Sequence, residues 1–353
     1  MKKIIANLVL QVSLLILLLG LLYKSLPYYW ANNTYSEKYE YFQTNKDKYN
    51  VLFFGSSSTH VQVMPTVFDK NTTQSTNSFN LAPPATFNPE NYFLLEKLLS
   101  QKAKEETVIL IDIINIGDIH KTNLHTIRAK YYLGIKEFLF FFKDFFDKDK
   151  VYIKNKIYVL KNYFITLFEH TFKINFRKDI IKYCIGEIDT GCPLGKYKDG
   201  NCSYEYEISL LDEKSSKRRG LELRKVNFIN GGQLRLKDID KKIERYSSQN
   251  AKVKAAKDYQ SFILKLEELQ SMAIQNNYEP IFYILPPGGY HKISILKNLE
   301  KSQTINLIQP DLYPELFIGE NHFDEGHLNE KSSVILSEAL ASEFNELVTN
   351  RDQ

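Results

Sequence analysis

Two short segments at opposite ends of this chain contain the residue types that acyl-transfer chemistry needs. Gly-Ser-Ser-Ser at 55–58 follows an apolar run, and Asp-Glu-Gly-His at 324–327 lies near the C-terminus. Ser57 would be the nucleophile, His327 the general base and Asp324 the carboxylate that orients the histidine. Because the two residues lie three positions apart on one turn, the carboxylate can accept from the imidazole Nδ1 and leave Nε2 facing the serine.

These residues can act together only if the fold brings them together. Short apolar runs predict five strands, at 49–54, 78–81, 107–114, 280–285 and 304–308. The third run is β-branched and nearly continuous, as strands covered on both faces tend to be. Segments with apolar residues at helical spacing lie between the runs. This alternation predicts a three-layer, flavodoxin-like α/β fold with a parallel five-stranded sheet.

The candidate residues follow the ends of predicted strands. In an open parallel sheet, the loops at the carboxyl ends of the strands converge on one crevice. Ser57 follows the first strand, Ala82 the second and Asn115 the third, whereas Asp324 and His327 come after the last. We therefore expect these positions to meet.

A long segment, 117–256, interrupts the alternation between the third and fourth strands. It lacks a clear strand–helix–strand pattern, and its first half has phenylalanines at helical spacing accompanied by lysines. We interpret it as a mostly helical insertion. The aromatic stripe, which begins at Phe138, either packs onto the rest of the domain, or rests on the membrane or grips a lipid or polymer substrate, as a basic amphipathic helix would.

The N-terminus differs from the rest of the chain. Lys2 and Lys3 precede a stretch without charged residues, 4–23, and about 20 such residues suffice for a helix to cross a bilayer. We expect a signal-anchor transmembrane helix at 1–23, a linker at 24–48 and the main domain at 49–348. A cleaved signal peptide is the alternative. The basic pair predicts a cytoplasmic N-terminus and an extracytoplasmic main domain, either periplasmic or at the cell surface.

Composition sets further limits. The 353 residues are 43% hydrophobic and 25% charged, which is typical of a globular protein, and the net charge is only +4. Because no lasting basic block occurs, we expect no nucleic-acid partner. Cys192 and Cys202 could form a disulfide with Cys184 left over, or all three could be free. No zinc-type cysteine spacing is present, and we expect neither a metal nor another cofactor.

The first motif resembles that of the SGNH, or GDSL, hydrolase superfamily. Members have an apolar strand that ends in Gly-Asp-Ser, and this chain has Gly55-Ser56-Ser57, with serine in place of the aspartate. The resemblance implies that Ser57 is the nucleophile. It also implies an oxyanion site made by the backbone N–H groups of Ser57 and Ala82 and the side chain of Asn115. Ala82 stands where the family has a glycine, and Asn115 lies near the family's Gly-x-Asn-Asp position.

The second motif of the family, Asp-x-x-His near the C-terminus, matches Asp324 and His327. The Gly-Ser-Ser variant is similar to membrane-anchored members that act on envelope polymers, such as proteins for teichoic-acid D-alanylation or exopolysaccharide O-acetylation. The resemblance therefore implies a serine esterase or O-acyltransferase that acts through an acyl-serine on an envelope glycan or glycolipid. A membrane acyltransferase would be a fitting partner. The insertion lies outside the resemblance.

Two other functions stay open. The chain could be a non-catalytic protein that binds a glycan or serves as the scaffold of an envelope acylation complex. It could also be a carboxylate- or metal-dependent enzyme that uses Asp112, Asp118 and His120.

Overall fold

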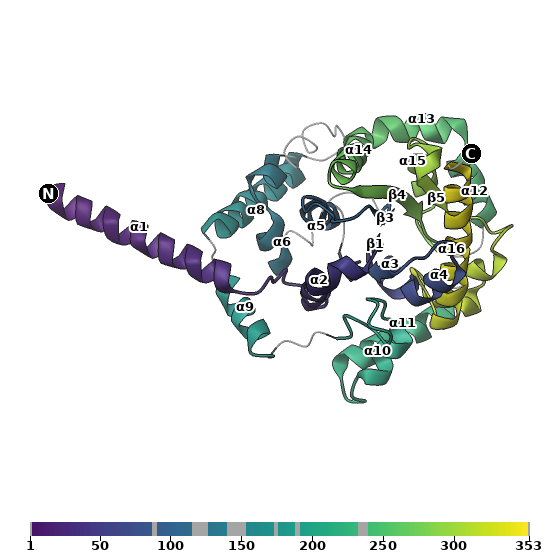
Figure 1. Ribbon diagram of the computed structural model, residues 1–353, viewed down its shortest axis with the longest axis horizontal. Coiled ribbons are helices and arrows are strands. Elements are labelled where there is room, and N and C mark those ends of the chain that lie inside the picture. Colours follow the sequence, from purple (N-terminus) through teal and green to yellow (C-terminus); the bar gives the residue numbers. More distant parts are fainter. Residues whose placement is uncertain are drawn as a thin grey trace.

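The computed structural model describes residues 2–86, 90–114, 126–139, 153–172, 176–187, 191–231 and 239–351. Its centre is a parallel sheet of five strands in the order β2-β1-β3-β4-β5 (Figure 1). The strands are β1 (Val51–Phe54), β2 (Ser78–Asn80), β3 (Thr107–Asp112), β4 (Tyr278–Ile284) and β5 (Thr304–Asn306). This confirms the predicted α/β class and the five-stranded parallel sheet.

Helices cover both faces of the sheet because successive strand residues point to opposite faces. Leu52 and Phe54 of β1 face one apolar cluster, whereas Val51 and Phe53 face another. The first cluster includes residues of α2 (Asn33–Asn45), α5 (Glu90–Leu99) and α14 (Gln260–Gln275). The second includes residues of α4 (Pro65–Asn71) and α16 (Glu330–Arg351). The strands are therefore sandwiched between two helical layers.

The segment predicted as a linker, 24–48, contains helix α2, which belongs to the domain. Tyr35, Tyr39 and Phe42 of α2 are buried in the first apolar cluster. These residues lie four and three positions apart, which places them on one helix face. The domain thus begins before the first strand.

The described elements between β3 and α14 are helices. They are α6 (Ile127–Tyr132), α8 (Ile153–Phe172), α9 (Phe176–Cys184), α10 (Tyr204–Leu210), α11 (Ser216–Gly231), α12 (Ile239–Ser247) and α13 (Gln249–Asp258). Phe138, at the start of the aromatic stripe, is buried and contacts Phe164 of α8, with ring centroids 5.0 Å apart. Phe164 and Phe168 are themselves more than half exposed. The stripe residues at 141–146 lie outside the described residues.

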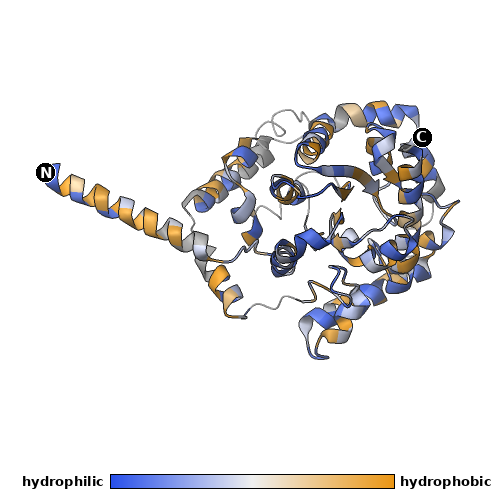
Figure 2. Cartoon of the chain, viewed as in Figure 1, coloured by the Kyte–Doolittle hydropathy of each residue, from blue (hydrophilic) through white to orange (hydrophobic). Residues whose placement is uncertain are grey.

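Helix α1 (Lys2–Ser25) extends away from the body of the molecule, and hydrophobic residues run along most of it (Figure 2). Within the residues that the structure describes, no helix combines the length and the apolar content that crossing a bilayer requires. The residues after α1 return to the body, where the ring of Tyr29 stacks on that of Tyr183 in α9, with centroids 5.1 Å apart.

A small antiparallel hairpin, β6 (His322–Asp324) and β7 (His327–Leu328), precedes α16. The sequence patterns did not predict this hairpin, because its two strands are only three and two residues long. It carries both residues of the Asp-x-x-His motif.

Candidate active site

Ser57 is the first residue of helix α3 (Ser57–Gln62), which begins directly after β1. The turn between them requires Gly55. A Cβ atom at this position would lie 2.6 Å from Cβ of Thr59 and 2.9 Å from Cβ of Asp112, closer than real side chains approach. The Gly55 carbonyl also accepts a 2.7 Å hydrogen bond from Asn91. The chain can therefore turn sharply enough to present Ser57 at the carboxyl end of β1.

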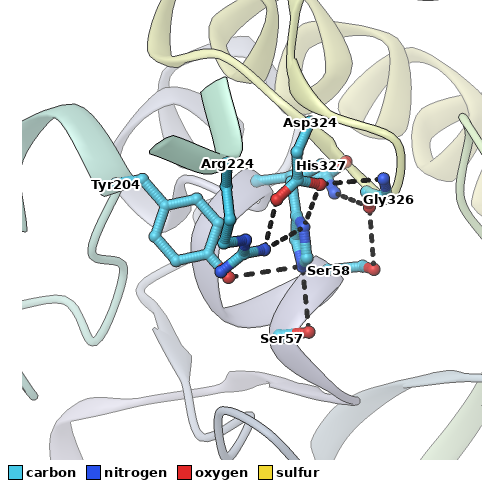
Figure 3. Close-up of polar contacts among 8 residues, drawn as sticks. Ser57, Ser58, Tyr204, Arg224, Asp324, Gly326 and His327 are labelled. Carbon is cyan, nitrogen blue, oxygen red and sulfur yellow. Dashed lines mark hydrogen bonds and ion pairs between the residues drawn. The ribbon is translucent and has the colours of Figure 1, made fainter. Parts of the chain in front are cut away.

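Asp324 and His327 lie on the two strands of the β6–β7 hairpin. The Nδ1 of His327 is 2.7 Å from Oδ1 of Asp324, and its Nε2 is 2.9 Å from Oγ of Ser57. Figure 3 shows these contacts in line. The structure thus brings together the three residues that the sequence motifs single out. In this arrangement Nδ1 of His327 donates its hydrogen to the carboxylate, and Nε2 can accept a hydrogen bond from the serine hydroxyl.

The carboxylate of Asp324 is nearly buried and ionised. Burial by itself raises its pKa, but the hydrogen bonds from His327 and from the Gly326 N–H, together with the charge of Arg224, outweigh burial and lower the pKa to about 2. An ionised carboxylate at this position would stabilise an imidazolium at His327.

Helix α3 and the hairpin are also joined directly. The Gln62 side chain donates to the carbonyl of Gly326 at 3.1 Å, and Ser58 donates to the same carbonyl at 3.4 Å. These bonds fix the separation between the serine helix and the histidine turn. Ser58 therefore has a structural contact of its own next to the candidate nucleophile.

Two residues of the insertion, which the sequence analysis missed, complete the site. The hydroxyl of Tyr204, at the start of α10, lies 3.5 Å from Nε2 of His327, and the two rings meet edge to face. Arg224 of α11 forms an ion pair with Oδ2 of Asp324 (Figure 3). Its guanidinium lies 4.9 Å from the centroid of the Tyr204 ring. No local motif marks either residue, since they are 123 and 100 positions away from their partners.

The segment closed by a disulfide between Cys192 and Cys202 holds α10 in place. The side chain of Asn201 donates to the carbonyl of Val61 in α3 at 2.9 Å. Ser203 caps α10 by accepting from the N–H of Tyr206 at 3.1 Å. Cys184, the cysteine outside this pair, is free and exposed. The disulfide-closed segment therefore connects the serine helix α3 to the start of α10.

The three predicted oxyanion donors have different surroundings. The N–H of Ser57 lies in the first turn of α3, where backbone donors have no partner within the helix. The N–H of Ala82 already donates to Oδ1 of Asn80 at 3.0 Å, and Ala82 is fully buried. Asn115 lies outside the described residues. Of the two predicted donors that the structure describes, Ser57 is thus the better placed for an oxyanion.

A second buried pair joins helix α2 to the serine helix α3. The Nζ of Lys38 is 2.9 Å from Nδ1 of His60, and it also donates to the carbonyl of Ala82. Burial lowers the pKa of both Lys38 and His60 well below their ordinary values. This pair links α2, α3 and the segment after β2, so we assign it a structural role.

Of the residues considered for a carboxylate or metal mechanism, the structure describes Asp112. It is fully buried at the end of β3, where Oδ1 lies 3.4 Å from Nζ of Lys292 and Oδ2 accepts from Thr59. Asp118 and His120 lie outside the described residues. Within the described part of the chain, no three potential metal-ligating side chains lie together.

No family model matches the chain, and no curated protein sequence matches it significantly. A function for the chain is therefore inferred from its motifs and from the geometry of the site.

Proposed function

We propose that this protein is an extracytoplasmic, membrane-anchored serine esterase or O-acyltransferase of the SGNH type. The observation that carries the proposal is the continuous series of contacts from Asp324 through His327 to Ser57, at 2.7 and 2.9 Å. A nucleophile, a base and an orienting carboxylate in this order are what acyl transfer through serine requires.

In the proposed reaction, His327 removes the proton from Ser57 while Oγ attacks the carbonyl carbon of an ester. The N–H of Ser57 donates to the oxyanion that forms, and Asp324 stabilises the imidazolium. His327 then gives its proton to the leaving alcohol, and an acyl-serine remains. Attack by water completes an esterase cycle, whereas attack by a sugar hydroxyl completes a transferase cycle. In both cases His327 takes the proton from the attacking oxygen.

For the substrate, we propose an acylated glycan or glycolipid of the cell envelope. The Gly-Ser-Ser variant of the first motif supports this class, and so does the basic pair that precedes the uncharged N-terminal stretch. The Cys192–Cys202 disulfide agrees with an oxidising, extracytoplasmic environment. We propose that residues 1–23 anchor the protein in the membrane, where a membrane acyltransferase could supply the acyl group.

The engaged N–H of Ala82 favours a second candidate, a non-catalytic scaffold or glycan-binding protein. Losing one oxyanion donor typically costs a factor of roughly 100 to 1,000 in rate. A chain with the triad but without a second donor could keep the fold for binding alone.

Labelling with an aryl fluorophosphonate tests the proposal without a known substrate. The full-length protein in detergent is expected to gain one phosphonate, which peptide mass spectrometry places on Ser57. Labelling of Ser57→Ala should fall by roughly a thousandfold or more, whereas the neighbouring Ser58→Ala, which loses one of the two bonds to the Gly326 carbonyl, should still be labelled on Ser57. Equal labelling of wild type and Ser57→Ala would rule out the serine mechanism. A folded wild type that is neither labelled nor active on acetyl esters would favour the scaffold.

A further inference from the structure

Arg224 contacts Oδ2 of Asp324, the carboxylate oxygen that does not face His327. Oδ1 of Asp324 faces His327 Nδ1 at 2.7 Å and accepts from the Gly326 N–H at 2.8 Å. Oδ2 is paired with Nη2 of Arg224. Because each oxygen has its own donor, rotation of the carboxylate about its last torsion would break bonds on both sides. Arg224 therefore fixes which oxygen faces the imidazole.

The guanidinium is itself held by aromatic contacts. It lies over the ring of Tyr204, and that ring packs against Phe323, the residue before Asp324, with centroids 4.8 Å apart. The Tyr204–Phe323 contact and the Arg224–Asp324 ion pair both join the insertion to the β6–β7 hairpin. Arg224 lies on helix α11 of the insertion, outside the part of the chain that resembles SGNH hydrolases.

The exposed fractions of the two side chains indicate whether Arg224 acts on Asp324 mainly through its charge or by orienting the carboxylate. The Arg224 side chain is 44% exposed and that of Asp324 only 11%. Water and salt screen the charge of a half-exposed guanidinium, but the direction of its hydrogen bond is unaffected. The main effect of Arg224 should therefore be on the geometry of the carboxylate.

We propose that Arg224 is a positioning residue that orients Asp324, so that the docking of the inserted helix α11 controls the activation of Ser57. This inference rests on the proposed serine mechanism. Nη2 of Arg224 also lies 3.5 Å from Nδ1 of His327, longer than the 2.7 Å contact of that nitrogen with Asp324. We therefore infer that Arg224 acts mainly through Asp324 and stands outside the proton-transfer path between Nε2 of His327 and Ser57.

The test measures the rate of fluorophosphonate labelling of the full-length protein in detergent. Arg224→Ala should label roughly tenfold more slowly, as expected for a misplaced orienting group. Arg224→Lys should retain part of the rate, because an ammonium can donate one bond. The matched control is Arg219→Ala on the same helix, where the side chain is exposed, and it should label at the wild-type rate.

Chemical rescue separates positioning from a general structural role. Guanidinium at concentrations far below those that unfold proteins should restore part of the Arg224→Ala rate, because the vacated position is open to solvent. Sodium chloride at the same ionic strength should not. A slow rate that guanidinium leaves unchanged would overturn the proposal, as would an Arg224→Ala variant that labels at or above the wild-type rate.

A double-mutant cycle shows whether Arg224 acts through Asp324. In an Asp324→Asn background, the further change Arg224→Ala should have little effect, because its target is already altered. Full additivity of the two losses would contradict the proposal. Ser57→Ala labelled as fast as wild type would instead remove the proposed function itself, so the two failures are distinguishable.

Discussion

Gly55 is the residue on which the position of Ser57, the candidate nucleophile, depends. It lies between a buried strand and a short helix, with Thr59 and Asp112 against its Cα. Thr59 is in turn bonded to Asp112 and to Tyr283, with the two hydroxyl oxygens of Thr59 and Tyr283 2.9 Å apart. Since these groups are buried and paired, none can move away cheaply to make room for a methyl group.

We predict that Gly55→Ala lowers stability by about 1–3 kcal/mol, the usual cost of overpacking, and slows phosphonate labelling by displacing Ser57. Thermal unfolding and labelling rates measure the two effects. Gly220→Ala is the control. Gly220 lies in α11 with nothing within 4 Å of an added Cβ, so this change should stabilise the helix by about 0.5–1 kcal/mol. Equal melting temperatures for wild type and Gly55→Ala would contradict the close packing.

The lowered pKa of Asp324, about 2 against an ordinary 3.8, predicts how its contribution to stability depends on pH. A carboxyl whose pKa is lower in the folded state stabilises the fold above its unfolded pKa, and the benefit disappears as pH falls through the folded value. The benefit is on the order of 2 kcal/mol. Wild type should therefore exceed Asp324→Asn in unfolding free energy by a constant amount above pH 4, and the gap should close toward pH 2. Denaturation at a series of pH values measures this, and a gap that widens in acid would contradict it.

At the scale of elements, three parts of the chain meet at the site: α3, the β6–β7 hairpin and the α10–α11 pair. The first two are joined through the Gly326 carbonyl. The third is joined to α3 by the segment between Cys192 and Cys202, through Asn201. We therefore expect the disulfide to stabilise the helix pair that places Tyr204 and Arg224.

We predict that replacing Cys192 and Cys202 by serine destabilises the protein by about 3 kcal/mol, the chain-entropy expectation for a short loop. It should also slow labelling, because Tyr204 and Arg224 lose their support. Unfolding and labelling with and without reductant measure both effects. Cys184→Ser should be neutral, since Cys184 is free and exposed. A double-serine variant as active and stable as Cys184→Ser would show that the disulfide does not support the site.

At the scale of the whole molecule, α1 and the neighbouring helices of the insertion form one end of the protein (Figure 1). The stacking of Tyr29 on Tyr183 ties the residues after α1 to α9. Cys184, the next residue in α9, is exposed. If the main domain is extracytoplasmic as we propose, this thiol faces the outside of the cell.

We therefore predict that a membrane-impermeant maleimide labels the protein in intact expressing cells, because Cys184 is reachable from outside. Labelling is read from the purified protein by mass spectrometry. Cys184→Ser should remain unlabelled, since Cys192 and Cys202 are bonded to each other. Modification of Cys184 only after the cells are permeabilised would contradict the proposed topology.

Much of this organisation was predictable from local patterns. All five strands of the sheet lie within or next to the predicted apolar runs, and strand alternation explains the two helical layers. The positions of Ser57, Asp324 and His327 followed from motif spacing together with the geometry of parallel sheets. The α2 helix was missed, although its buried aromatics at 35, 39 and 42 lie at helical spacing.

Other features had no local signal. Side chains meet across long stretches of chain only when the helices that carry them dock, and helix spacing says nothing about the docking partner. Tyr204 and Arg224 are such residues, and nothing in their neighbourhood sets them apart from other polar residues of the insertion. The engagement of the Ala82 N–H by Asn80 is local in sequence, but it depends on a turn geometry that residue types alone do not specify.

The amino-acid sequence by itself determined the class of fold, the succession of the five strands along the chain and the identities of the candidate serine, histidine and aspartate. These follow from periodicity and from short-range spacing, which each segment carries on its own. Only the tertiary structure decided that Nε2 of His327 lies within hydrogen-bond distance of Ser57 and that Arg224 holds the far oxygen of Asp324. Such contacts depend on the relative placement of distant elements, and the packing of the whole chain sets that placement.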